Sequence, residues 1–180
     1  MTFLHLRVWF VLLSLTGCAT TPQDRSRIEA LNRDLLTHPS ATATLTDWCA
    51  HGRLADPPVI RAIQVPADDH PADSDVRALL GAGAGEVVKH RHVRLVCGSH
   101  LMSEADNWYL PARLTAAMNA TLQTADTPFG RVVAPLNFRR RTLSVQVLGH
   151  PSRYAIVHRA VLITPDGTPF SLVVERYPPP

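Results

Sequence analysis

The stretch YAIVHRAVLITPDGTPFSLVVERY, residues 154–177, decides the fold of this chain of 180 residues. Two runs rich in β-branched and aromatic residues, 154–164 and 168–177, flank the tripeptide Pro165-Asp166-Gly167. Such a tripeptide between two such runs is a strong turn signal. Because strands joined by a short turn pair antiparallel, the C-terminal end of the chain predicts a β-hairpin.

The rest of the chain extends this hairpin into a sheet with helices. Further strands are expected at residues 59–65, 86–97, 101–110 and 138–148, where β-formers lie between turn residues. Helices are expected where apolar residues recur at helical spacing or follow a capping residue, around Leu31, Trp48, Leu79, Met118 and Phe129. Residues 28–180 are therefore predicted to form a single α+β domain. Its core is an antiparallel sheet of about six strands with helices packed on one side.

The N-terminus resembles a bacterial lipoprotein signal. Arg7 precedes a short apolar run, and Leu15-Thr16-Gly17-Cys18 follows it. The run is too short to remain as a membrane-spanning helix. The resemblance implies cleavage of residues 1–17, diacylation of the Cys18 sulfur and a stable lipid anchor, with residues 18–27 as a tether. The protein would lie in the cell envelope facing the periplasm. Ala19 favours the outer membrane if the cell is Gram-negative.

Charge and cysteine content restrict the chemistry further. The formal net charge of +3 becomes +2 once Arg7 is removed, which gives no basis for binding nucleic acid. Two cysteines remain besides Cys18. In an oxidising compartment Cys49 and Cys97 either form one disulfide or stay as two buried thiols, and the spacing leaves both alternatives open.

Three charged residues share strand faces with apolar neighbours. Arg91 alternates with Val93 and Leu95, Arg159 with Val157 and Val161, and Glu175 with Val173 and Tyr177. Alternation places each charge toward packed interior. Because a buried charge requires a partner, either these residues pair to close the sheet, or they surround a cavity that holds an anionic ligand.

An ordered set of short motifs over residues 86–177 resembles the chorismate–pyruvate lyase family. The set comprises Arg91-His92-Val93-Arg94-Leu95-Val96-Cys97-Gly98, Asn107-Trp108-Tyr109-Leu110-Pro111, Thr127-Pro128-Phe129-Gly130-Arg131 and the strand at 169–177 with Glu175. Members of that family enclose one ligand under an antiparallel sheet and convert chorismate to 4-hydroxybenzoate and pyruvate without a cofactor.

This resemblance implies a role for each of the three charged residues. Arg91 would hold the ring carboxylate through two parallel hydrogen bonds, and Arg159 would be a second carboxylate partner. Glu175 would be the catalytic acid at the ether and hydroxyl end. The expected function is therefore binding of a small aromatic or cyclic carboxylate in a closed pocket, and lyase activity is left open as a secondary expectation. The alternative is a non-catalytic envelope lipoprotein that kept the scaffold for binding or assembly, since an exported enzyme would rarely meet chorismate.

Departures from the family and other clusters complete the sequence evidence. Asn107 stands where the family has an arginine, and the acidic stretch 104–106 would disfavour an anion if it faced the pocket. His90 and His92 have the spacing of a zinc pair, but no ordered metal motif accompanies them, so exposed histidines without a metal are expected. The run 139–141, three arginines, is expected to be a solvated strand edge.

Overall fold

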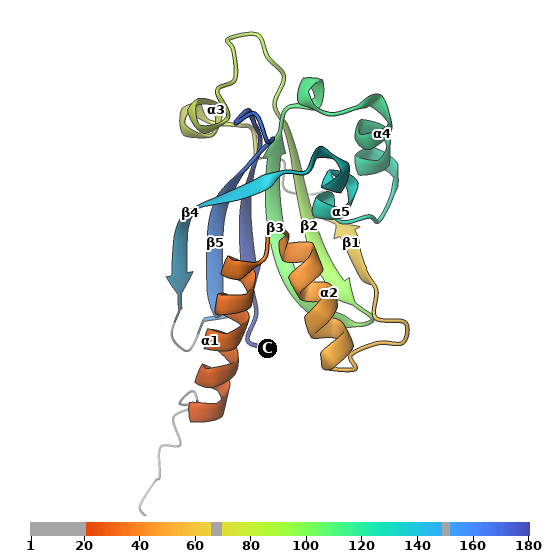
Figure 1. Ribbon diagram of the computed structural model, residues 1–180, viewed down its shortest axis with the longest axis vertical. Coiled ribbons are helices and arrows are strands. Elements are labelled where there is room, and N and C mark those ends of the chain that lie inside the picture. The colour runs from red at the N-terminus through yellow and green to blue at the C-terminus, as the bar shows by residue number, and fades with distance from the viewer. Residues whose placement is uncertain (1–20, 66–69, 149–151) are drawn as a thin grey trace, which may run out of the picture.

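The computed structural model describes residues 21–65, 70–148 and 152–180. The strands form one six-stranded antiparallel sheet in the order β1-β2-β3-β6-β5-β4 (Figure 1). They span β1 Ile60–Gln64, β2 Lys89–Cys97, β3 His100–Tyr109, β4 Arg139–Val147, β5 Ile156–Ile163 and β6 Pro169–Tyr177. The α-helices are α1 Pro22–Thr37, α2 Ala41–His51, α3 Ser74–Leu80, α4 Ala116–Thr124 and α5 Phe129–Val132, with 3-10 turns Pro111–Arg113 and Ala134–Leu136. The predicted α+β class is confirmed.

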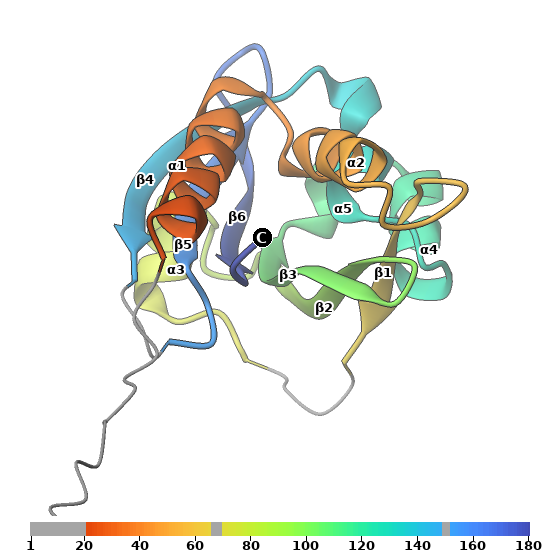
Figure 2. The same ribbon diagram turned by 90° about the horizontal axis from the view of Figure 1, so that it is seen from below.

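One face of the sheet carries most of the core. α1 and α2 lie side by side over this face (Figures 1 and 2), and α4 and α5 cover its other end. The residues on this face include Val93, Ala105, Val173 and Tyr177. α3 packs instead on the opposite face, where Val76 and Leu80 contact Leu172. The helices therefore cover both faces, whereas the sequence predicted them on one.

The first helix begins earlier than expected. Thr21 caps α1 because its side-chain oxygen accepts a hydrogen bond from the Asp24 backbone N–H, and the Asp24 carboxylate accepts one from the Thr21 backbone N–H. This reciprocal capping box stabilises the first turn, and Pro22 at the first helical position is compatible with it. Residues 22–27, which were expected to belong to a polar tether, are thus helical.

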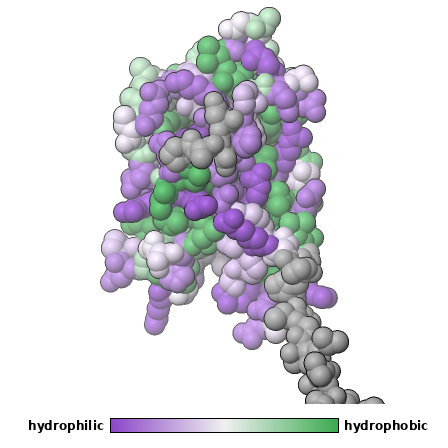
Figure 3. Space-filling model, turned by 180° about the vertical axis from the view of Figure 1, so that it is seen from behind, coloured by the Kyte–Doolittle hydropathy of each residue, from purple (hydrophilic) through white to green (hydrophobic). Residues whose placement is uncertain are grey.

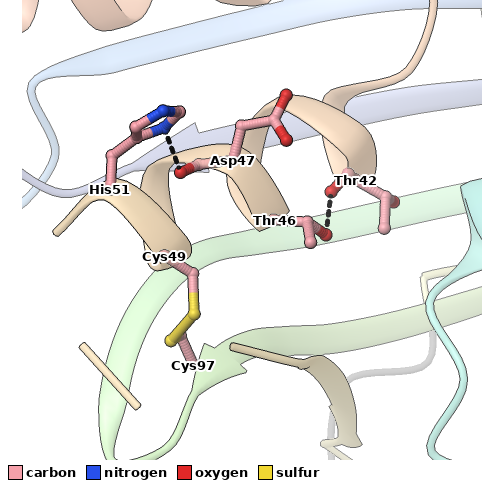
Figure 4. The surroundings of a disulfide bond; sticks show 6 residues. All are labelled: Thr42, Thr46, Asp47, Cys49, His51 and Cys97. Atoms are coloured by element: carbon pink, nitrogen blue, oxygen red, sulfur yellow. Dashed lines mark hydrogen bonds between the residues drawn. A yellow bond between two sulfur atoms is a disulfide. The ribbon is translucent and has the colours of Figure 1, made fainter. Parts of the chain in front are cut away.

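A disulfide joins α2 to the end of β2. Cys49 and Cys97, which are both fully buried, are bonded at a Cα–Cα distance of 6.1 Å (Figure 4). The alternative of two free thiols is therefore wrong. This bond fixes the C-terminal end of α2 on the sheet.

Cys18 and the rest of the predicted lipoprotein signal lie outside the described residues. Among the residues that are described, no helix is long and apolar enough to cross a membrane.

Candidate functional site

Arg91 lies on the covered face of the sheet with most of its guanidinium unpaired. It is 6% exposed, and one nitrogen, Nη2, donates to the carbonyl of Thr127 at 3.3 Å. Its Nε and Nη1 are buried without a hydrogen-bond partner. Burial lowers the pKa of Arg91, an effect that the nearby Tyr109 hydroxyl opposes. A buried cation with two free donors is costly unless an anion completes it.

Glu175 has a partner that the sequence did not suggest. Arg140 Nη2 lies 2.5 Å from Glu175 Oε2, and the Tyr177 hydroxyl donates to the same oxygen at 3.0 Å. The side chains of Arg140 and Glu175 are 6% and 11% exposed. Burial alone would lower the pKa of Arg140, but the charge of Glu175 raises it above its ordinary value. The expectation that Arg140 belongs to a solvated edge is therefore wrong.

Arg91 and Glu175 do not touch, yet they lie on neighbouring rows of the same face. Arg91 is paired with Asn107 and Asn107 with Val173, whereas Glu175 is paired with Ala105 and Ala105 with Val93. Two strand spacings and two residues separate their Cα atoms by about 12 Å.

A small, partly open cavity occupies this patch of the sheet. Its volume is about 30 Å³. The floor comprises Val93, Ala105, Asn107, Val173 and Glu175, with Arg140 beside it, and the roof comes from α2 and α5. Arg91 does not line the cavity, although its strand partner Asn107 does. The cavity has room for water but not for an aromatic ring, since pockets for such ligands measure roughly 300 Å³ or more.

A thin partition separates this cavity from a larger outer bowl. The bowl has a volume of about 600 Å³ and shares Pro39, Ser40, Thr42, Gly130 and Phe138 with the inner cavity. Gly130 closes the partition tightly: a Cβ on it would lie 2.9 Å from Thr42 Oγ1 and 3.1 Å from Ser40 Oγ. A small separation of α5 from the start of α2 would therefore join the two spaces.

Arg159 lies on the other face of the sheet. Glu175 is paired with His158 and Arg159 with Val174, so Arg159 and Glu175 point to opposite sides. This placement corrects the expectation that Arg159 shares a carboxylate ligand with Arg91.

The two histidines also lie on that other face, where they are buried. His90 Nε2 and His92 Nδ1 each contact Asp106 Oδ1 at 2.9 Å, and their side chains are 3% and 8% exposed. Exposed histidines were therefore the wrong expectation. Arg176 Nη1 donates to Asp106 Oδ2 at 2.7 Å. Burial alone would raise the pKa of Asp106, but the bonds from Arg176 and His90 hold it below its ordinary value.

The acidic stretch of β3 is neutralised on this back face. Glu104 contacts Arg94, Arg153 and His92. Because Ala105 alone of this stretch faces the cavity, the acidic residues do not repel an anion there. Within the described ranges, no group of three or more His, Cys, Asp or Glu side chains is arranged to hold a metal. Seen from behind, this side of the molecule mixes hydrophilic and hydrophobic residues (Figure 3).

Several site residues were missed by sequence reasoning. Arg140 was hidden in a run of three arginines, and Ser40 and Thr42 were not singled out at all. The signal for Gly130 was present in the Thr-Pro-Phe-Gly motif, because a residue without a side chain there permits the close contact with Thr42.

Comparison with curated proteins identifies a relative. This chain is 44% identical over 180 residues to the uncharacterized protein y4mC of Sinorhizobium fredii, covering 84% of this chain and 76% of the relative. The chain belongs to the y4mC family. No family model matches its sequence.

Solved structures show the same fold at low identity. The effector domain of PhnF from Mycobacterium smegmatis superposes with a TM-score of 0.54 at 14% identity, covering 78% of this chain and 88% of that domain. The longer PhnF structure gives a TM-score of 0.57 at 13% identity over 79% of this chain, which spans 65% of the PhnF chain. The y4mC family member thus has the chorismate lyase-like fold that effector domains also use.

Proposed function

We propose that this protein binds a small aromatic or cyclic carboxylate between Arg91 and Glu175, on the covered face of the sheet. The observation that carries the proposal is the buried guanidinium of Arg91, with two nitrogens that have no partner. A carboxylate accepts two parallel hydrogen bonds from a guanidinium and would satisfy both donors. The effector-domain fold of PhnF supports a binding role for this scaffold.

The ligand would enter through the outer bowl. The inner cavity is too small in the closed form, so Gly130 and Thr42 must separate before a ring can reach the sheet. Opening would join about 30 Å³ to about 600 Å³, enough for one ring compound.

Binding is favoured over catalysis. A general acid must offer its proton to the leaving oxygen, but Glu175 Oε2 already accepts hydrogen bonds from Arg140 and Tyr177. We therefore propose a lipid-anchored binding protein of the cell envelope, held by Cys18, rather than a chorismate–pyruvate lyase.

The test is calorimetric titration of the full chain with 4-hydroxybenzoate and with chorismate. Arg91→Met should abolish binding, whereas Arg159→Met, on the opposite face, should leave it unchanged. Equal loss in both variants, or no binding by the wild-type chain, contradicts the proposal. Release of pyruvate from chorismate would establish the lyase instead, and mass spectrometry of protein from membranes would test acylation of Cys18.

A further inference from the structure

A separate groove lies at the end of the molecule where α1 begins. Its volume is about 510 Å³, within the usual range for ligand sites. It is formed by α1, the C-terminal half of α2, the β2–β3 hairpin and the C-terminal prolines, which Figure 2 shows together from below. The residues that line it are all different from those that line the inner cavity and the outer bowl.

The floor of this groove is apolar. Six large apolar side chains from four segments line it: Leu31, Leu45, Trp48, Leu54, Leu101 and Met102. The disulfide to Cys97 fixes α2 next to it. Trp48 is held in place because its Nε1 donates to Asp34 Oδ2 at 3.0 Å. Apolar surface of this extent favours an alkyl chain or a similar hydrophobic group.

The rim carries charges of both signs, from Arg27 and Asp34. Asp34, which is the only carboxylate side chain among the lining residues, is engaged by Trp48 and lies 3.8 Å from Arg33. Arg27 also lines the groove and has no ion pair within the described residues. His51 and His100 also line the groove. An anionic headgroup beside Arg27 would complement this rim.

The position of the groove suits a molecule from a bilayer. Only two residues lie between Cys18 and Thr21, so a lipid on Cys18 would sit within about 10 Å of the start of α1. This step rests on the proposed lipid anchor, whereas the shape and charge of the groove do not.

We infer that this groove binds the acyl chain of a membrane-derived anionic amphiphile, with the carboxylate or other anionic head at Arg27 and the chain against Trp48. The probe is 11-bromoundecanoate, whose terminal bromine quenches tryptophan fluorescence at short range. The full chain with Trp9→Phe and Trp108→Phe leaves Trp48 as its only tryptophan.

Saturable quenching of Trp48 below the micelle concentration is expected. Arg27→Glu should weaken the apparent affinity about fivefold, since it reverses one partly exposed charge contact. Arg33→Glu, on the same helix but outside the groove, should change it less than about twofold. Absence of quenching, or equal effects of the two variants, overturns the inference. Binding of 4-hydroxybenzoate at Arg91 is measured in a separate experiment. A negative result for one of the two sites therefore does not affect the result for the other.

Discussion

Arg140 and Glu175 form an ion pair on the covered face of the sheet, with Arg140 Nη2 only 2.5 Å from Glu175 Oε2. The pair joins edge strand β4 to β6 across β5, because Arg140 is paired with Leu162 on β5. Tyr177 donates to the same carboxylate oxygen. The Glu175 carboxylate is thus paired within the sheet, without a ligand.

Replacing one member of this ion pair should lower the stability of the protein more than replacing both members. Arg140→Met is expected to lower the free energy of unfolding by about 3–5 kcal/mol, because it leaves Glu175 buried without its cation. The double variant Arg140→Met/Glu175→Leu should lose much less. Denaturant unfolding of the single and double variants measures the coupling. Additive losses would show that the two side chains act independently.

Replacing Arg91, in contrast, should not lower the stability of the protein. Arg91→Met removes a buried cation with two unsatisfied nitrogens, so the unliganded protein is expected to be at least as stable as wild type. The same variant should lose 4-hydroxybenzoate binding. A gain in stability together with a loss of binding identifies a residue kept for a ligand. A marked loss of stability would instead indicate a structural role.

The strands and their turns were predictable from the sequence because their signals are local. The hairpin around Asp166 and the helix capped by Thr115 follow from turn and capping chemistry, and both occur as expected. Glu175 was correctly placed with Val173 and Tyr177, since a side chain's face follows from alternation within one strand.

The predictions were wrong for side chains whose surroundings depend on neighbouring strands and helices. β5 is buried on both faces, so alternation showed that Arg159 has apolar neighbours but not which face carries the cavity. On β4 an irregularity between Thr142 and Ser144 shifts the register, and most of the strand is exposed. Nothing in the run of three arginines distinguishes Arg140, because its burial depends on residues far away in the sequence.

The disulfide should contribute substantially to stability. Cys49 and Cys97 are 48 residues apart, and closing a loop of that length corresponds to about 4 kcal/mol in the chain-entropy model. The variant Cys49→Ser/Cys97→Ser should lose about this much in denaturant unfolding. Reduction of the wild-type protein serves as the control and should give a similar loss. A change below about 1 kcal/mol would contradict the assignment.

The partition at Gly130 gives a test of ligand entry. Gly130→Ala places a Cβ 2.9 Å from Thr42 Oγ1, so α5 and α2 must move apart or the protein is strained by about 1–3 kcal/mol. Adding Thr42→Ala removes the clashing oxygen and should recover most of that loss. Stopped-flow binding of 4-hydroxybenzoate should be faster in Thr42→Ala than in the wild type. Thr46→Ala is the matched control, since Thr46 lines only the outer bowl. Equal rates in the two variants would place the entrance elsewhere.

Asp106 should make the stability of the back face sensitive to acid. Its pKa is lowered in the fold, by hydrogen bonds from Arg176 and His90 that outweigh burial. A carboxylate with a lowered folded pKa contributes stability that is complete above its unfolded pKa of about 4 and is lost as the pH falls through the folded value.

Asp106→Asn should therefore lower the free energy of unfolding by about 3 kcal/mol at pH 7, because Arg176 loses a buried anionic partner. The difference from wild type should shrink below about pH 4, because the unfolded wild-type chain takes up a proton there more readily than the folded protein does. Asp47→Asn, at an exposed position of α2, is the control for removing a carboxylate elsewhere. Unfolding curves for the three proteins between pH 3 and pH 7 decide the matter, and a gap between Asp106→Asn and wild type that stays constant with pH would exclude an electrostatic origin.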